Sequence, residues 1–288
     1  MQCVRVTQLK YFCVNGKKND IFILFRGINI AMPANKDIQK FMEEGEKLFL
    51  PSLSVDCVIF GFHNNELKVL LLKMRNVDKW SLPGGFIFKN EHTDAAAARV
   101  LKERTGLSEL FLQQFYIFGE PSRSDKAVHL RSMKAEGIVP DESHWILQRF
   151  VTIGYYALVE FSHVTPIPDE LSIACEWYGL DNAPELMMDH QQILDKALES
   201  LRLHLTYHPV GYNLLPDTFT MPQLQKLYET ILGKKLDRRN FQRKMLAYKI
   251  LKRMKERKRG GAHKSPYLYC FDLRKYHKAL KDGLQGGW

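Results

Sequence analysis

One stretch of the sequence limits the fold more than any other. Residues 84–107 read GGFIFKNEHTDAAAARVLKERTGL. Two adjacent glycines favour a turn, and Thr93 or Asp94 is placed to cap a helix that follows. Gly106 is a natural residue to end that helix. The stretch therefore predicts a glycine turn placed directly before an amphipathic helix that carries acidic and basic side chains.

The spacing of this stretch resembles the Nudix box of nucleoside-diphosphate-X hydrolases, G-x5-E-x7-R-E-U-x-E-E-x-G-U, where U is aliphatic. The positions that match in register are Gly85, Glu91, Arg99, Leu101, Glu103, Gly106 and Leu107. The resemblance implies an α+β or α/β fold, a Nudix-like α/β/α sandwich around a mixed sheet.

Two positions depart from that box, because Val100 and Arg104 stand where the family pattern has acids. In the family, three acids at i, i+3 and i+4 share one helix face, hold Mg²⁺ and activate water. Here Val100 offers no ligand, and Arg104 offsets the charge of Glu103. We therefore expect no catalytic residue in the box and no cofactor.

The alternative is a hydrolase of nucleoside-diphosphate-linked substrates, which would need Mg²⁺ and would leave Glu91 and Glu103 as its remaining box carboxylates. Glu103 also lies four residues after Arg99. It can pair with Arg99 and so hold the glycine turn, or it can contact a ligand.

Apolar runs along the first two thirds of the chain predict strands, and HNNEL predicts a hairpin loop between the first two. The runs cover residues 54–62, 68–74, 110–119, 149–161 and 174–180, the last as an edge strand. Residues 36–48 predict a short helix. A second helix begins at Asp189, with Gln192 completing a capping box. Residues 125–148 form a polar insertion that is long for a plain loop.

Four segments follow from these patterns. Residues 1–50 are an N-terminal extension of uncertain role, in which residues 11–24 are compatible with a hairpin. Residues 51–206 form the Nudix-like domain and 207–219 a linker that contains proline and glycine. Residues 220–288 form the last domain.

The charge is concentrated in that last domain. Residues 221–288 hold 19 Lys and Arg against 5 Asp and Glu, a net charge of +14, whereas the whole chain has +10. Such a segment favours a polyanionic partner.

The last domain has the pattern of a winged helix. Leu224, Leu227 and Tyr228 lie at helical spacing, between Thr220 as cap and Gly233 as stop. A second helix opens at Asp237, and the runs at 250–257 and 267–273 predict a hairpin, the wing. The second helix and wing carry the predicted DNA contacts Arg238, Arg239, Gln242, Arg243, Arg259 and Lys264.

The two halves together resemble bacterial transcriptional regulators that join a Nudix-like domain to a C-terminal winged helix, and within them the arabinose-responsive type of Bacteroidetes. WSLPGGF, MDHQQILDKA, GYNLLPDTFTMPQLQKLYE and DRRNFQRK carry this resemblance. It implies a homodimer that binds duplex DNA and responds to a small effector, a pentose or an ADP-ribose-type nucleotide. RNA binding through the same basic segment is an alternative.

The neutralised acid face favours a sugar or sugar phosphate as effector. Side chains on or near the expected pocket are Lys73, Arg75, Trp80, Phe86, Arg104 and Arg149. No apolar run approaches the roughly 20 residues that span a membrane, so no membrane partner is expected. Five scattered cysteines without a CxxC pair favour reduced thiols and a cytoplasmic location.

Overall fold

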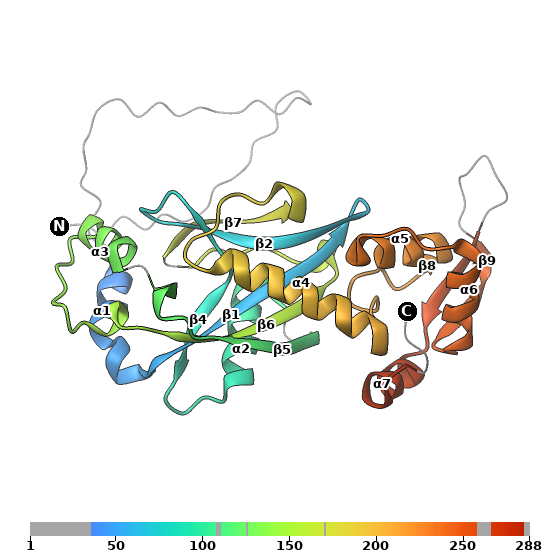
Figure 1. The fold of residues 1–288 in the computed structure, drawn as a ribbon, viewed down its shortest axis with the longest axis horizontal. Coiled ribbons are helices and arrows are strands. Elements are labelled where there is room, and N and C mark those ends of the chain that lie inside the picture. The colour runs from blue at the N-terminus through green and yellow to red at the C-terminus, as the bar shows by residue number, and fades with distance from the viewer. Residues whose placement is uncertain (1–35, 108–110, 125, 170, 258–265, 285–288) are drawn as a thin grey trace, which may run out of the picture. The chain divides into compact units, whose positions relative to one another are not determined.

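The computed structural model describes residues 36–107, 111–124, 126–169, 171–257 and 266–284 (Figure 1). Its helices are α1 (Lys36–Leu48), α2 (Thr93–Thr105), α3 (Lys126–Ala135), α4 (His190–Tyr207), α5 (Met221–Leu232), α6 (Arg238–Ala247) and α7 (Leu273–Asp282). Its strands are β1 (Phe49–His63), β2 (Glu66–Met74), β3 (Trp80–Ser81), β4 (Gly84–Phe88), β5 (Phe111–Phe118), β6 (Val151–Val159), β7 (Ser172–Gly179), β8 (Phe219–Thr220), β9 (Leu251–Arg257) and β10 (Tyr267–Phe271). The predicted helix over residues 36–48 and the predicted strands are confirmed.

The larger sheet has the order β3-β2-β1-β6-β5, with β4 also paired to β1 and β7 to β2. Strands β1 and β6 run parallel, whereas β1 and β2 are antiparallel and meet at the predicted turn, where His63 pairs with Glu66. The sheet is therefore mixed, as expected. Strand β7 pairs with β2 alone among the described strands, which fits the predicted edge strand.

Alternation along β1 explains why helices cover both faces of this sheet. Val55, Cys57 and Ile59 are fully buried in the core cluster that includes α2. Val58 and Phe60, which point the other way, belong to the cluster that includes α4. Because side chains alternate across a strand, a run that is apolar at every position needs a helix on each face. The predicted α/β/α sandwich follows directly.

Helix α2 has a different cap from the predicted one. The cap is His92, whose Nδ1 accepts a hydrogen bond from the backbone N–H of Asp94 (3.3 Å). The Asp94 carboxylate instead accepts a hydrogen bond from the hydroxyl of Tyr155 on β6 (2.6 Å). The predicted end is confirmed, since Gly106 has a left-handed φ of 75° and donates its N–H to the Lys102 carbonyl (2.8 Å).

The insertion between β5 and β6 packs against α1. A buried cluster joins the two segments through Ile38, Met42, Met133, Ile146 and Leu147. The indole N–H of Trp145 donates to the carbonyl of Met42 (2.8 Å). The segment predicted as a long polar insertion therefore contains helix α3, and α1 is part of the packing of the same domain.

The C-terminal segment folds as a winged helix. Thr220 caps α5 in a reciprocal capping box with Gln223, and Gly233 ends the helix at φ 67°. Phe241 and Met245 of α6 are buried. Strands β9 and β10 pair as the predicted hairpin, although its tip at residues 258–265 lies outside the described part of the chain. The hairpin expected at residues 11–24 also lies outside it.

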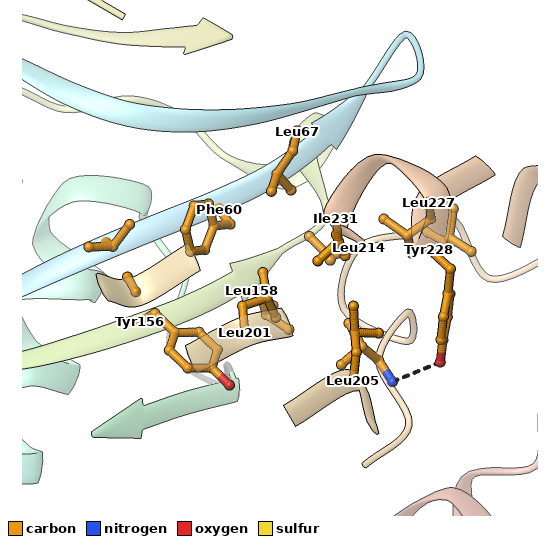
Figure 2. Close-up of a cluster of buried hydrophobic side chains, with 14 of the residues drawn as sticks. Phe60, Leu67, Tyr156, Leu158, Leu201, Leu205, Leu214, Leu227, Tyr228 and Ile231 are labelled. Carbon is orange, nitrogen blue, oxygen red and sulfur yellow. Dashed lines mark hydrogen bonds between the residues drawn. The ribbon is translucent and has the colours of Figure 1, made fainter. Parts of the chain in front are cut away.

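A single buried cluster continues from the large sheet through α4 into the winged helix (Figure 2). Two hydrogen bonds reinforce it. The Nε of Arg202 on α4 donates to the Ile231 carbonyl on α5 (2.8 Å), and the Val210 N–H donates to the Tyr228 hydroxyl (3.3 Å). The residues that Figure 2 labels are Phe60, Leu67, Tyr156, Leu158, Leu201, Leu205, Leu214, Leu227, Tyr228 and Ile231.

Replacing Leu201 by Ala should destabilise the protein, because Leu201 is fully buried in this cluster. We expect a loss of about 2–5 kcal/mol in the free energy of unfolding, measured by urea denaturation. Leu203→Ala is the matched control on the same helix, since Leu203 is 64% exposed and its truncation should change stability by about 0.5 kcal/mol or less. Equal effects of the two substitutions would contradict the packing described.

Candidate functional site: two cavities and a basic helix

The glycine turn before α2 is held by Arg99. Its Nε and one terminal nitrogen each donate to Glu91 (2.9 Å both), and that terminal nitrogen also donates to the Phe86 carbonyl (2.8 Å). These hydrogen bonds lower the pKa of Glu91. Glu103 lies 3.6 Å from Arg99, so it supports the same guanidinium. Both box glutamates are thus engaged in holding the turn.

Val100 packs directly against that turn. Its side chain is 1% exposed and belongs to the core cluster under α2. A Cβ atom added at Gly85 would lie 2.8 Å from Val100 Cγ2, which explains why this strand position needs glycine. The first of the replaced acids is therefore an apolar packing residue.

Arg104 is a buried cation on the same helix. It is 8% exposed, and one terminal nitrogen lies 3.4 Å from Asp169 and 3.6 Å from Glu103. Its Nε has no hydrogen-bond partner within the described part of the chain. Arg104 thus supplies a positive charge where the family pattern has an acid.

These residues do not fit a magnesium ion. A hard dication needs several free carboxylate oxygens, whereas the box offers Glu91 and Glu103, both paired with arginine. Arg104 would repel the ion at short range. No group of three or more His, Cys, Asp or Glu side chains suited to a metal occurs among the described residues.

Two cavities flank strand β4, and both are lined by its first three residues, Gly84 to Phe86. The larger one, of about 770 Å³, lies between α1, α2 and residues 167–169 and 171, and Arg99, Glu103 and Arg104 line it. The smaller one, of about 180 Å³, is lined by β1, α3 and the residues before α4. Asp169 and Leu171 also line both, so the two cavities are neighbours.

The predicted effector contacts are distributed unevenly around these cavities. Phe86 lines both, and Arg104 lines the larger one. The other four side chains line neither cavity and have local partners. Lys73 pairs with Asp78 (3.1 Å), Arg75 lies 4.0 Å from Glu136, Trp80 packs on the ring of Tyr178, and Arg149 donates to the Gly119 carbonyl.

A buried cluster of ion pairs around Arg123 lies beside the smaller cavity, and the sequence patterns did not indicate it. Arg123 donates to both carboxylate oxygens of Asp189 (2.8 and 3.0 Å) and lies 3.5 Å from Asp56. The side chains of Arg123 and Asp189 are 3% and 9% exposed. One signal for the site was available, because Asp56 is a carboxylate inside the otherwise apolar run VDCVIF.

The predicted capping box at the start of α4 is wrong. Asp189 is the N-cap residue, but its side chain makes no capping hydrogen bond. The reason is its long-range partner, since Arg123 takes both carboxylate oxygens of Asp189.

The winged helix presents a basic surface on α6. Arg238, Arg239, Gln242 and Arg243 are exposed, and Asp237 caps the helix by accepting the Asn240 N–H (2.9 Å). Exposed arginines and a glutamine on one helix are suited to phosphates and base edges. The wing residues Arg259 and Lys264 lie outside the described residues. Helix α7 was not predicted, and its exposed basic side chains are Arg274, Lys275, Lys278 and Lys281.

Comparison with known families gives two matches. A family model described as NUDIX domain matches residues 50–199, and one described as NrtR DNA-binding winged helix domain matches residues 211–271. Together they confirm the predicted order of a Nudix fold followed by a winged helix. No helix among the described residues is long and apolar enough to cross a membrane.

Two curated proteins are similar along much of the chain. One, named ADPR responsive transcriptional repressor NtrR, from Acinetobacter baylyi (strain ATCC 33305 / BD413 / ADP1), is 29% identical over 247 residues, which cover 83% of this chain and 90% of the relative. The other, named ADP-ribose pyrophosphatase, from Methanocaldococcus jannaschii, is 24% identical over 189 residues, which cover 64% of this chain and 93% of that protein.

A solved structure shares the whole arrangement. Shewanella oneidensis NrtR complexed with a 27mer DNA superposes with a TM-score of 0.61 at 27% identity, covering 78% of this chain and 95% of that one. A MutT/nudix family protein from Enterococcus faecalis reaches a TM-score of 0.56 at 22% identity, over 82% of this chain and 93% of that one, which supports the fold.

Replacing Asp189 by Asn should destabilise the protein strongly, because Arg123 would lose its bidentate partner inside the domain. We expect a loss of about 3–5 kcal/mol in the free energy of unfolding. Asp181→Asn makes the same change at an exposed position and should cost about 0.5 kcal/mol or less. Thermal and urea unfolding of both variants checks this, and wild-type stability for Asp189→Asn would refute the buried ion pair.

Proposed function

We propose that this chain, which belongs to the NUDIX domain family, is a transcriptional repressor that binds duplex DNA and is controlled by a sugar-containing effector. The observation that carries the proposal is the connection made by α4. At its N-terminus His190 lines the smaller cavity and Asp189 binds Arg123, which also lines it, and near its other end Arg202 bonds to α5 of the winged helix. A ligand at one end can thereby bias the DNA-binding end.

An effector can relieve repression through the thermodynamic linkage between effector binding and DNA binding. An effector releases DNA only if it binds a protein geometry that the DNA complex disfavours. In the proposal, these two geometries differ in the placement of α5 relative to the sheet, and α4 connects that change to the effector. The name of the Acinetobacter relative supports both the repressor role and ADP-ribose as effector.

Two effectors fit the proposal, ADP-ribose and a free pentose of the kind bound by arabinose-responsive regulators. The larger cavity, of about 770 Å³, has room for a nucleotide. We further propose that the protein acts in the cytoplasm as a homodimer, because two symmetric winged helices read two half-sites of a palindromic operator.

Hydrolysis is not part of the proposed function. The carboxylates left in the box are paired with arginine, and Val100 is in the core. The basic surface of α6 favours duplex DNA over RNA, because a helix of this kind enters the major groove of B-DNA, whereas the major groove of A-form RNA is too narrow.

Replacing Arg239 by Ala should weaken binding to operator DNA by about 5- to 150-fold, the equivalent of about 1–3 kcal/mol for a lost base or phosphate contact. Fluorescence anisotropy over a range of salt concentrations measures it, and binding by the wild type should fall as salt rises. Lys102→Ala removes one exposed charge from α2, outside the winged helix, and should bind like the wild type. Absence of wild-type binding to any duplex at low salt would end the proposal.

Incubation with ADP-ribose or other nucleoside-diphosphate sugars and Mg²⁺ or Mn²⁺ should give no turnover, since the box offers no free acid cluster. Liquid chromatography of the products checks this. Turnover that Glu103→Gln abolishes would instead establish the hydrolase alternative.

A further inference from the structure

Helix α7 adds a basic surface that lies beyond the matched winged-helix model. That model ends at residue 271, whereas α7 spans Leu273–Asp282. The helix contains four Lys and Arg residues and one acidic residue, Asp282. Its cations therefore lie outside the part of the chain that the family model describes.

Three of these cations occupy one side of the helix. Arg274, Lys278 and Lys281 are exposed and lie at positions i, i+4 and i+7, so they share a face. The opposite side is packed, since Tyr276 is 4% exposed and its hydroxyl donates to the Pro209 carbonyl (2.8 Å). Within the described residues, the ion pair of α7 is made by a different side chain, so the charges of these three are available to a partner.

Helix stability alone does not favour these positions. The first turn of α7 contains Arg274 and Lys275 and no acidic residue. The amino end of a helix carries the positive end of its dipole, so cations there are unfavourable. Helix α6 has the same arrangement, because Arg238 and Arg239 follow its cap, Asp237. An anion bound outside the helix would relieve the repulsion in both cases.

The start of α7 is held beside the end of α6. The Asp272 N–H donates to the carbonyl of Ile250, which lies between α6 and β9 (2.8 Å). Lys252 and Lys275 lie 3.4 Å and 3.7 Å from the Asp272 carboxylate, and two lysines around one aspartate leave a net charge of +1. Basic side chains therefore continue from α6 through the start of β9 to α7.

Two features favour nucleic acid over a lipid surface. An amphipathic helix binds a membrane through a free apolar face, whereas Tyr276, Ala279 and Leu280 of α7 pack into the buried cluster of the winged helix. From Arg274 to Lys281 the helix rises by about 10 Å, at roughly 1.5 Å per residue. That length is comparable with about three phosphates of one DNA strand, at roughly 3.4 Å each.

We propose that the α7 surface, formed by Lys252, Arg274, Lys275, Lys278 and Lys281, binds phosphates of operator DNA next to the segment that α6 contacts. The inference rests on the proposed DNA-binding function and extends it to a helix outside the matched model. Binding then depends on the length of the duplex, because only a duplex that continues past the operator offers the flanking phosphates.

Fluorescence anisotropy with two lengths of one duplex tests the inference. The wild type selects the operator from a random-sequence pool, and this operator is prepared alone and with about ten further base pairs, one helical turn, on each side. The wild type should bind the long duplex roughly tenfold more tightly at low salt. Its log Kd should also depend more steeply on log salt, by about 0.9 for each added phosphate contact. Equal affinity and equal salt dependence for the two lengths would overturn the proposal.

A triple variant assigns this difference to α7. Arg274→Ala/Lys278→Ala/Lys281→Ala removes three exposed charges and should abolish the difference between the two duplexes. Binding to the operator alone should stay at the wild-type level, which also shows that the variant is folded. A variant that keeps the wild-type preference for the long duplex would refute the α7 surface.

The matched control is Lys47→Ala/Lys89→Ala/Lys102→Ala. It removes the same charge from exposed positions of the Nudix domain and α1. This control should keep the preference for the long duplex. Loss of the preference in both triple variants would show an effect of net charge alone and would also refute the surface.

The α6 variant Arg239→Ala separates this inference from the proposed function. It should weaken binding to both duplexes, because α6 contacts the operator itself. If it does so while the wild type binds both lengths equally, the DNA-binding function stands and the α7 surface is refuted. If the wild type selects no duplex, the DNA-binding function fails and this inference fails with it.

Discussion

The bidentate ion pair between Arg123 and Asp189 fixes the start of α4, and much of the structure depends on that helix. One face of α4 covers the large sheet, and its last turns meet α5 through the Arg202 hydrogen bond and the shared buried cluster. In the proposed function α4 moves as a rigid body, so that a change at its first residues reaches the winged helix. One element of structure thus connects the proposed effector site with the basic helix α6.

In the box helix α2, Arg104 and Val100 stand where the family pattern has metal-binding acids. Arg104 introduces a fixed cation between Glu103 and Asp169, and Val100 fills space against Gly85. The charges of the remaining acids are balanced inside the protein, without an ion. The same turn and helix then line two neighbouring cavities.

Helices and strands were predictable where the sequence pattern involves only neighbouring residues. Apolar alternation located the strands, and Thr220, Gly233 and Gly106 marked helix ends correctly, because a cap depends on a few adjacent residues. Two caps were mispredicted for one physical reason. Asp94 bonds to Tyr155, and Asp189 to Arg123, partners that lie 61 and 66 residues away. Two of the expected pocket residues, Lys73 and Arg75, line neither cavity and contact Asp78 and Glu136 instead.

The sequence by itself determined the class of fold, the basic winged helix and the loss of the metal-binding acids. These follow from the spacing and charge of neighbouring residues, which can be recognised without knowledge of long-range contacts. Only the tertiary structure decided where the cavities lie. Asp56, Arg123 and His190 come from three separate segments, and a pocket is formed by the distances between segments, which no local pattern encodes.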